Sequence, residues 1–538
     1  MTKGHDVAQE RSFVPGEALT DRFEQFVRAA PEVISVRDDS GSSLSRIQLW
    51  DQAAALSQTL AGSGVRARDV VLVLLPNRVE WQVALLACLQ LGAVPATIPM
   101  TTDARTLAYV LELIGARAII TLPHHRRAAT GERVLEAARQ AGNACQVLTL
   151  QDDGAYLTTE INGRRPPSAP EHLEHLMFTS STTGWPKAVM HTRDTLAAVN
   201  RGFAERFGIS ESTPLFMPSP VGHSVGAWHG GRLSLFCGAQ LVLQDEWDPQ
   251  KALQTVEEHQ CYFTAAATPF LKDLVDAPWD NPHPKLASLR AFLCGGAPVP
   301  PHLLEEAGVQ MPNTFVTVLW GMTEGGVTTG VPGEDASRSV GLAGLPLPGL
   351  ELRILSDESA PGEGEGELAM RGPGVFVGYM GQEDLYQASV TPDGFFRTGD
   401  LARLEPNGYL KLTGRLKDLI VRGGVNLSPI PIEEAIARHP SVRQVAVIGS
   451  PDERIGERIC AVVVLDRGFE IDLPQLNEWL TGQGLSRRLL PERLMVVSDM
   501  PVTAAGKIRK VDLKPMVEQA KPSGKTSTAI NSQEEDES

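Results

Sequence analysis

Apolar positions along the first part of the chain follow two kinds of spacing. Residues 49–63 carry apolar side chains at helical intervals, and residues 83–91 repeat that pattern. Residues 70–75 and 118–121 are instead short, almost unbroken apolar runs. Such runs between helices are typical of strands buried on both faces of a mostly parallel sheet. The pattern therefore predicts an α/β fold.

The same alternation returns after Gly208. Residues 239–243 form another apolar run, which predicts a strand, and residues 249–259 again show helical spacing. Because no pattern repeats at a fixed period, a solenoid is excluded.

The most apolar stretch, residues 81–100, is interrupted by glutamines, a glycine and two prolines. A membrane-spanning helix needs about 20 predominantly apolar residues without such breaks. We therefore expect a buried helix that ends near Gly92, followed by a strand.

A change of pattern around residues 414–418 indicates a domain boundary. A strand-like segment ends at Leu412 and passes into a short charged linker. A new unit follows, with a helix at 432–438 and strands at 445–448 and 461–465. The final residues are rich in Ser, Thr, Lys and acidic side chains, a composition typical of disorder. The expected parts are residues 1–414, residues 415–520 and a disordered tail, 521–538.

Composition excludes several classes of protein. The 538 residues, of which 42% are hydrophobic and 21% charged, fit a globular protein of more than one domain and exclude a fibrous or disordered chain. A net charge of -16 argues against binding to nucleic acid or to an anionic membrane. The six cysteines are scattered without metal-site spacing, which predicts buried free thiols in a reducing compartment. Since the polar N-terminal residues lack a signal-peptide core, we expect a cytoplasmic protein.

The segment 179–187, Thr-Ser-Ser-Thr-Thr-Gly-Trp-Pro-Lys, follows an apolar run. It offers hydroxyl groups, backbone N–H groups and one ammonium, which are the donors that surround a polyphosphate. A polar surface turn explains the same composition equally well. The spacing does not match the Walker phosphate loop.

Three charged residues stand in settings that allow either chemistry or a plain structural role. Glu324 follows Thr323 in an apolar, Gly-rich stretch, so its carboxylate is either solvated at a strand end or holds a hard cation such as Mg²⁺. Asp400 lies in a Thr-Gly-Asp turn, where it either caps the turn or accepts hydrogen bonds from a diol. Lys507 follows a glycine close to the C-terminus and is otherwise an ordinary exposed lysine.

These residues belong to a series of motifs that resembles the adenylate-forming enzymes, which include acyl-CoA synthetases, peptide-synthetase adenylation domains and firefly luciferase. The phosphate loop of that family reads T-S-G-T-T-G-x-P-K-G, and here Ser181 and Ala188 replace two of its glycines. The resemblance extends over residues 21–517. The other motifs follow in the family's order: Gly295-Gly296-Ala297-Pro298, Trp320-Gly321-Met322-Thr323-Glu324, Arg397-Thr398-Gly399-Asp400, Gly414-Arg415-Leu416-Lys417-Asp418, Gly423-Gly424-Val425-Asn426 and Gly506-Lys507-Ile508-Arg509-Lys510.

The resemblance implies a set of residues that bind the nucleotide or coenzyme A. They are Thr179, Ser180, Ser181, Thr182, Thr183, Gly184, Lys187, Gly295, Gly296, Ala297, Pro298, Trp320, Gly321, Met322, Asp400, Arg415, Lys417, Gly423 and Gly424. Trp320 replaces the family's usual Tyr and offers a flat face for adenine, although a core Trp is an equal alternative. Asp400 is implied to bind the ribose and Arg415 the ribose or phosphate, while Lys417 falls at the hinge between the domains.

Four residues are implied to act in catalysis. Glu324 would ligate the Mg²⁺ on ATP, and Thr323 would bond the α-phosphate. Lys507 would bridge the α-phosphate and the attacking carboxylate, where it stabilises charge on the phosphoryl oxygens. His223 falls where acyl-CoA synthetases carry a His near the acyl carboxylate, although a satisfied core histidine is an equal alternative.

The expected acid pocket is apolar. Amino-acid adenylation domains place an Asp in this region to pair the α-ammonium, and residues 218–244 contain none. Trp228 and the small residues 265–267 indicate an apolar pocket with one bulky wall. The segment looks most like synthetases for medium-chain, alicyclic or aromatic acids.

The resemblance thus implies a large α/β N-terminal domain and a small, mobile α+β C-terminal domain. The implied reaction joins a carboxylic acid to AMP with release of pyrophosphate, and then transfers the acyl group to coenzyme A. ATP, Mg²⁺ and coenzyme A are the expected cofactors and co-substrates, with a small-molecule acid as partner and a monomer or homodimer as assembly. The small domain is expected to turn between the two half-reactions, so that the loop at Gly423 and Gly424 replaces Lys507.

Three alternatives stay open. The chain is an adenylation enzyme that loads a separate carrier protein, or a diverged member that activates nitrite for diazo formation on an aryl amine. The second alternative rests on Ser181 and Ala188, which change the phosphate loop itself. A non-catalytic binding protein on the same fold is the third alternative. It is disfavoured by the presence of the whole implied set, Glu324, Asp400, Arg415 and Lys507.

Overall fold

The computed structural model describes residues 16–179, 185–279, 285–296, 299–334, 341–356, 364–503 and 508–519. The chain forms two compact units, neither of which is continuous in sequence. The first unit consists of Met1–Glu246, Thr323–Gly325 and Pro373–Glu383, and the second unit contains the rest. Among the helices in the described ranges, none is both long and apolar enough to cross a lipid bilayer.

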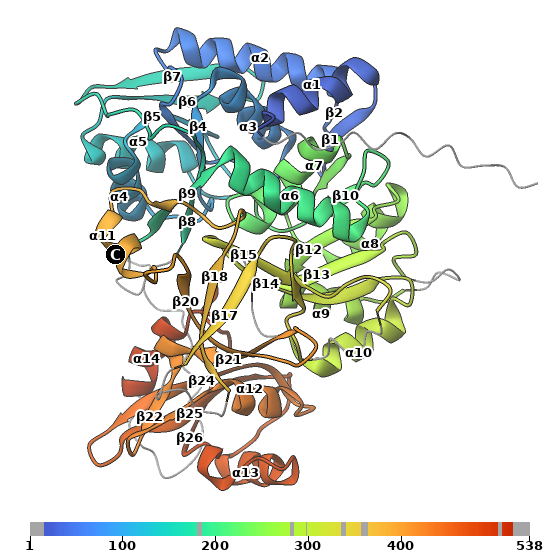
Figure 1. The fold of residues 1–538 in the computed structure, drawn as a ribbon, viewed down its shortest axis with the longest axis vertical. Helices are drawn as coiled ribbons and strands as arrows, with labels where there is room; N and C mark the ends of the chain where they lie inside the picture. Colours follow the sequence, from blue (N-terminus) through green and yellow to red (C-terminus); the bar gives the residue numbers. More distant parts are fainter. Residues whose placement is uncertain are drawn as a thin grey trace, which may run out of the picture. The chain divides into compact units, whose positions relative to one another are not determined.

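The larger sheet of the first unit has eight strands in the order β19-β9-β8-β4-β3-β5-β6-β7 (Figure 1). Its centre, from β8 to β6, is parallel, and antiparallel strands flank it on both sides. The strands are β3 (Val70–Val73), β4 (Val94–Thr97), β5 (Ala116–Thr121), β6 (Cys145–Leu150), β7 (Tyr156–Ile161), β8 (Leu173–Thr179), β9 (Lys187–Thr192) and β19 (Gly378–Tyr379). The predicted α/β class and its buried parallel sheet are confirmed.

Two helices were predicted in the first unit, at 49–63 and 83–91, and both are close to their predicted positions as α2 (Arg46–Gly62) and α3 (Val79–Leu91). The unit also contains α1 (Leu19–Ala29), α4 (Ala104–Ile114), α5 (Thr130–Ala141), α6 (Arg193–Phe207) and α7 (Leu233–Cys237), which were not predicted. Ser45 and Gln48 form a capping box that starts α2. Gly92 ends α3 in the left-handed conformation, and β4 begins two residues later. The apolar stretch 81–100 is therefore a buried helix followed by a strand, as predicted.

A second group of strands in the first unit runs in the order β10-β11-β1-β2. These strands are β1 (Ile34–Asp38), β2 (Ser43–Ser45), β10 (Leu215–Met217) and β11 (Leu241–Leu243). β11 is shorter than the predicted strand 239–243, because Gly238 caps α7 and the N–H of Ala239 still bonds to Ser234. Between β10 and α7 the chain forms an eight-residue π-helix, η1 (Val225–Arg232).

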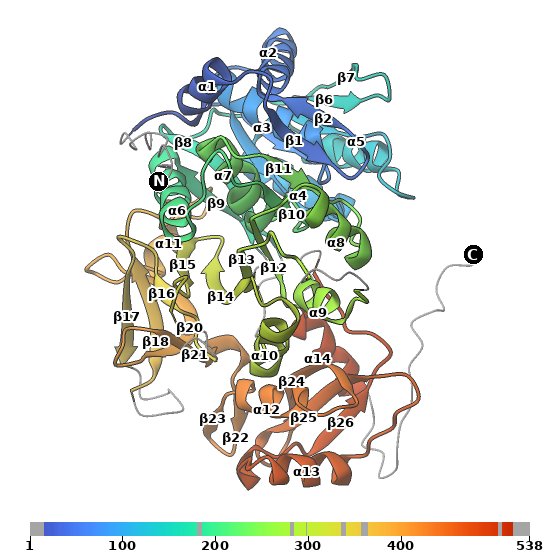
Figure 2. The same cartoon turned by 90° about the vertical axis from the view of Figure 1, so that its right-hand side faces the viewer.

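The second unit begins with strands in the order β16-β15-β14-β13-β12, of which β12, β13 and β14 are parallel. The bounds are α8 (Pro249–Glu258), β12 (Phe263–Ala267), α9 (Thr268–Asp276), β13 (Ala291–Gly295), α10 (Pro301–Gln310), β14 (Phe315–Met322), β15 (Gly325–Thr329) and β16 (Leu345–Pro346). Figure 2 shows the antiparallel sheet that follows in this unit, in the order β17-β18-β20-β21. It contains β17 (Glu351–Ser356), β18 (Gly366–Arg371), β20 (Phe396–Leu404) and β21 (Leu410–Arg415), and α11 (Glu383–Ala388) precedes β20.

The C-terminal part of the second unit is a sheet with helices on both faces (Figure 1). Its elements are the short 3₁₀ turn η3 (Leu416–Asp418), β22 (Ile420–Arg422), β23 (Val425–Leu427), α12 (Ile430–Ala437), β24 (Val442–Asp452), β25 (Gly456–Leu465), α13 (Leu473–Gly482), η4 (Arg487–Leu489), β26 (Arg493–Val496) and α14 (Lys510–Gln519). Alternate residues of β25 point to opposite faces. Ile459 packs with α12 and α13, whereas Cys460 packs with α14. The predicted boundary at 414/415 falls at the end of β21 and stays a prediction, and the tail 521–538 lies outside the described residues.

Candidate active site

The expected phosphate loop joins strands β8 and β9. Thr179, the last residue of β8, is paired in register with Lys187, the first residue of β9. The two strands therefore fix both ends of the loop close together. The predicted phosphate-binding residues 180–184, from Ser180 to Gly184, lie outside the described residues.

Trp185 connects the end of this loop to helix α4. Its ring lies 4.6 Å from the ring of Tyr109 and 5.1 Å from the guanidinium carbon of Arg105. Aromatic pairs and cation–π contacts of this kind each contribute roughly 0.5–1 kcal/mol. The Trp in the loop motif thus anchors the chain just before Lys187.

Lys187, Tyr379 and Glu324 form a chain of polar contacts in the first unit. Lys187 Nζ donates to the Tyr379 hydroxyl at 3.1 Å, and that hydroxyl donates to Glu324 Oε1 at 2.7 Å. Lys187 Nζ itself lies 3.9 Å from Glu324 Oε1. Glu324 is buried, with 3% exposure. Burial, followed by the charge of Glu324, raises the pKa of Tyr379, so its hydroxyl stays a donor.

The backbone around Glu324 is held at several points. His191 Nε2 lies 2.8 Å from the carbonyl oxygen of Thr323, and the N–H of Phe376 donates to the carbonyl of Glu324 at 2.9 Å. Gly325 has φ +110°, and a Cβ there would come within 2.4 Å of the carbonyl oxygen of Gly374. Only glycine fits such a close approach. The turn that carries Thr323 and Glu324, two of the four predicted catalytic residues, is therefore fixed by its neighbours.

The contacts of His191 identify its neutral tautomer. Since a carbonyl oxygen only accepts, Nε2 must carry the proton that bonds to Thr323. Burial lowers the pKa of His191 to about 4, so the ring is neutral and Nδ1, which lies 3.0 Å from the Thr195 hydroxyl oxygen, carries no proton. Trp228 packs edge-on against this ring, with centroids 4.6 Å apart. Trp228 is only 4% exposed. Burial of this kind fits a core residue as well as a pocket wall, so its predicted role as a pocket wall stays a prediction.

We expect Tyr379→Phe to lower the rate of adenylate formation about tenfold. The substitution leaves a buried carboxylate without its donor, a loss that typically costs about 1–3 kcal/mol. Pyrophosphate release at saturating ATP measures the effect, and Tyr262→Phe, at the half-buried residue just before β12, is a matched control. An unchanged rate in Tyr379→Phe would show that the hydroxyl does not support Glu324.

Asp400 is held by two donors within the second unit. Arg415 Nε donates to Oδ1 at 2.6 Å, and Trp320 Nε1 donates to Oδ2 at 2.8 Å. Asp400 and Trp320 are buried, with 4% and 6% exposure. Each carboxylate oxygen keeps a further lone pair, so a diol remains a suitable ligand. Trp320 is thus a residue that orients Asp400, and its predicted adenine contact stays a prediction.

The prediction of a tight turn at Thr398–Asp400 is wrong. These residues lie inside strand β20, between β18 and β21. The register with β18 shifts there, and Gly399 has φ +74°, so the segment is a β-bulge. A bulge and a turn use the same residue types. Pairing with strands on both sides, which the local sequence does not reveal, decides between them.

The other residues of the second unit that were predicted to bind the nucleotide lie at strand ends. Gly295 ends β13, where a Cβ would lie 2.4 Å from the carbonyl oxygen of Leu319, and Gly296 follows with φ +83°. Gly321 and Met322 end β14. The predicted residues Ala297 and Pro298 lie outside the described residues.

The segment around His223 is fixed by Asn77. The Asn77 amide donates to the carbonyl of Ser219 at 2.9 Å, and its oxygen accepts from the N–H of Val221 at 2.8 Å. His223 lies half-buried just before the π-helix η1. π-Helices are frequent at functional sites, and the predicted catalytic role of His223 stays a prediction.

The predicted motifs of the C-terminal part lie on different elements. Lys417 is exposed in η3, and Gly423 and Gly424 form the turn between β22 and β23. Lys507 lies outside the described residues, but the residues on either side are anchored by a bridge between Val502 and Ile508.

The structure therefore brings the predicted residues into two groups. Thr179, Lys187, Thr323 and Glu324 meet in the first unit, and Trp320, Asp400 and Arg415 meet in the second. Sequence analysis missed Tyr379, His191 and Asn77, which support these groups. None stands in a motif that we identified. In the described part of the chain, no three His, Cys, Asp or Glu residues are placed to hold a metal by themselves.

Comparison with known proteins matches most of the chain to one enzyme family. The model of the AMP-binding enzyme family matches residues 23–380, and that of the AMP-binding enzyme C-terminal domain matches residues 431–507. A medium-chain fatty-acid–CoA ligase of Escherichia coli is 31% identical, with 92% of this chain and 90% of the ligase aligned.

Two further comparisons have similar coverage. A salicylyl-CoA synthase/salicylate adenylyltransferase of a Streptomyces species is 30% identical over 95% of this chain and 96% of that protein. The structure of ATP-bound MatB from Rhodopseudomonas palustris aligns with a TM-score of 0.81 at 25% identity, over 93% of this chain and 99% of MatB.

Proposed function

Because the chain belongs to the AMP-binding enzyme family, we propose that it activates an apolar carboxylic acid as acyl-AMP and then transfers the acyl group to coenzyme A. The chain is an AMP-forming acid–thiol ligase. In the first half-reaction a carboxylate oxygen attacks the α-phosphorus of ATP and pyrophosphate leaves. In the second, the thiol sulfur attacks the acyl carbon, AMP leaves and the thiol proton passes to water.

The observation that carries this proposal is the Lys187–Tyr379–Glu324 arrangement at the end of the phosphate loop. It combines an ammonium that suits a phosphate with a buried carboxylate that suits a hard cation. Among the described residues, the only hydrogen bond to the Glu324 carboxylate comes from Tyr379, to Oε1. Oε2 is therefore available to a ligand.

These residues fit Mg²⁺ bound together with ATP. Mg²⁺ commonly binds through one or two carboxylates, substrate phosphates and water. Glu324 would supply the carboxylate, and the ion would neutralise charge on the phosphates. Lys187 would contact the phosphates, while the Tyr379 hydroxyl orients Glu324. Thr323, whose backbone His191 holds in place, would bond the α-phosphate.

Two observations support an apolar acid without an α-amino group. Residues 218–244 contain no acidic side chain that would pair an α-ammonium, and an unpaired buried ammonium is strongly disfavoured. The named substrates of the two relatives, a medium-chain fatty acid and salicylate, also lack an α-amino group.

The test is a ranking of acids by hydroxamate formation, which traps the activated acyl group. We expect octanoate and aromatic acids such as benzoate, salicylate and cinnamate to exceed phenylalanine, with reactions lacking ATP as controls. Addition of coenzyme A should convert the same acids to thioesters. Phenylalanine ranking first would contradict the apolar pocket. Failure of every acid, with ATP consumption only on nitrite and an aryl amine, would contradict acid activation itself.

A further inference from the structure

The loop that is expected to face coenzyme A is a very short hairpin at the edge of the C-terminal sheet. Strands β22 and β23 have three residues each, and Gly423 and Gly424 connect them with φ +60° and +80°. Two positive φ values are typical of a type I′ turn. β22 pairs with β25 in register only at Arg422 and Gly456. A hairpin with so little pairing needs other contacts to hold its position.

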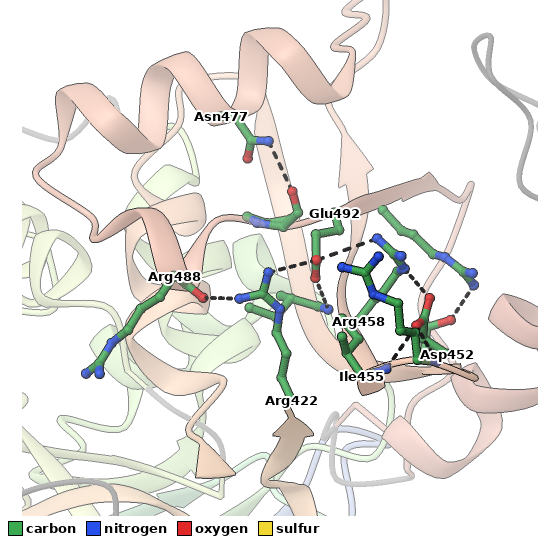
Figure 3. Close-up of polar contacts among 12 residues, drawn as sticks. Arg422, Asp452, Ile455, Arg458, Asn477, Arg488 and Glu492 are labelled. Carbon is green, nitrogen blue, oxygen red and sulfur yellow. Dashed lines mark hydrogen bonds and ion pairs between the residues drawn. The ribbon is translucent and has the colours of Figure 1, made fainter. Parts of the chain in front are cut away.

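Arg422, the residue before the glycines, provides one such contact (Figure 3). Its Nη2 donates to Glu492 Oε1 at 2.9 Å, and its Nη1 donates to the carbonyl oxygen of Arg488 at 3.2 Å. The N–H of Gly423 donates to the carbonyl of Ile455 at 2.7 Å. The glycine turn is thus attached on one side to Glu492 and on the other to Ile455.

Glu492 is itself fixed to strand β25. Its N–H donates to the carbonyl of Ile459 at 2.9 Å, and its Oε2 accepts from the N–H of Ile459 at 3.1 Å. The side chain of Glu492 is 20% exposed, and that of Arg422 is 29% exposed. The carboxylate therefore spans from a buried strand to the edge hairpin.

The contacts close into a ring that returns to the glycine turn. Arg458 lies 3.7 Å from Glu492 Oε1 and donates to Asp452 Oδ2 at 2.5 Å. Asp452 Oδ1 accepts from the N–H of Ile455 at 3.2 Å, the residue whose carbonyl binds Gly423. We call Arg422, Asp452, Arg458 and Glu492 the Glu492 network (Figure 3). Because Glu492 is the only member that contacts both Arg422 and Arg458 among the described residues, its loss opens the ring.

We propose that Glu492 is a positioning residue for the Gly423–Gly424 loop in the transfer of the acyl group to coenzyme A. The inference rests on the proposed function, because it assigns the network to the second half-reaction. Glu492 touches no reacting group in this account. It acts through Arg422, which sets where the turn lies. Adenylate formation does not use this loop and should not depend on Glu492.

The experiment separates the two half-reactions of the full-length enzyme. In Glu492→Gln, we expect kcat/KM for coenzyme A to fall about tenfold or more with supplied acyl-AMP, since a misplacement of about 1 Å can cost about 10²-fold. Hydroxamate formation without coenzyme A should stay within about twofold of wild type. Asp499→Asn is the matched control, because Asp499 pairs with Arg443 at 3.8 Å elsewhere in the C-terminal part and is 83% exposed.

A second variant tests the same proposal if Glu492→Gln folds poorly. Arg422→Gln removes the other partner and should cause the same selective loss. The double variant should be no worse than either single one, because the two residues act as a unit. Equal loss of both half-reactions, or no loss of acyl transfer in either variant, would overturn the inference. If the wild-type enzyme formed no adenylate from any acid, the proposed function would fail instead.

Discussion

Lys507→Ala is expected to lower the rate of adenylate formation about 10²- to 10³-fold. This is the usual cost of removing one preorganised contact that stabilises charge in a transition state. Negative charge builds on the phosphoryl oxygens as pyrophosphate leaves, and the ammonium of Lys507 is the group that the family motif places there. Thioester formation from supplied acyl-AMP should persist, because the role proposed for Lys507 belongs only to the first half-reaction.

The segments on either side of Lys507 have contacts of their own, which the substitution leaves in place. The N–H of Arg509 donates to the carbonyl of Pro501 at 2.8 Å, and Lys510 forms a 2.7 Å ion pair with Glu433 on α12. These contacts involve no side-chain atom of Lys507. Lys514→Ala, on the exposed side of α14, is the control. Equal loss of both half-reactions in Lys507→Ala would contradict the assigned role.

Glu324→Gln should raise the Mg²⁺ concentration needed for half-maximal adenylate formation and lower the rate by at least about 10- to 100-fold, the usual cost of losing a residue that only supports a metal ligand. An amide oxygen is a weaker ligand for a hard dication than a carboxylate oxygen. The glutamine keeps the shape of the side chain and can still accept from Tyr379, so the effect reports the lost charge.

A Mg²⁺ titration at saturating ATP measures this effect. Glu351→Gln is the control, because Glu351 pairs with Arg371 on the surface and is 57% exposed. If the titration curve of Glu324→Gln matched that of the wild type, Glu324 would be a structural residue of the turn. Tyr379→Phe should raise the Mg²⁺ requirement in the same direction but by less, because Tyr379 only orients the carboxylate.

The sequence predicted elements where the local pattern determines the structure. The run at 70–75 and the glycine at position 92 correctly indicated a buried strand and a helix end, because burial on both faces and a left-handed cap each demand particular residue types. The β-bulge at Gly399 was missed because strand pairing, not local composition, determines it.

The candidate site was predictable only in part, for a related reason. Glu324 was identified because it stands in a motif that resembles one of the adenylate-forming family, since a surface glutamate at a strand end explains the residue seen alone. Tyr379 contacts it across 55 residues of sequence, and His191 contacts Thr323 across 132 residues. A tyrosine or histidine with such a distant partner shows no local pattern. Folding alone brings the supporting residues to the motif.

The discontinuous composition of the first unit has a consequence for protein synthesis. The ribosome completes Glu246 well before Glu383, the last residue that this unit requires. At roughly 5–20 residues per second, the intervening 383 − 246 = 137 residues take about 7–27 s to translate. During that interval β9, the strand of Lys187, still lacks its neighbour β19. For most of the interval, neither Glu324 nor Tyr379 has been translated. The unit that carries the predicted phosphate loop therefore cannot finish folding until much of the second unit has been translated, and a fragment ending at Glu246 would lack Glu324 and Tyr379.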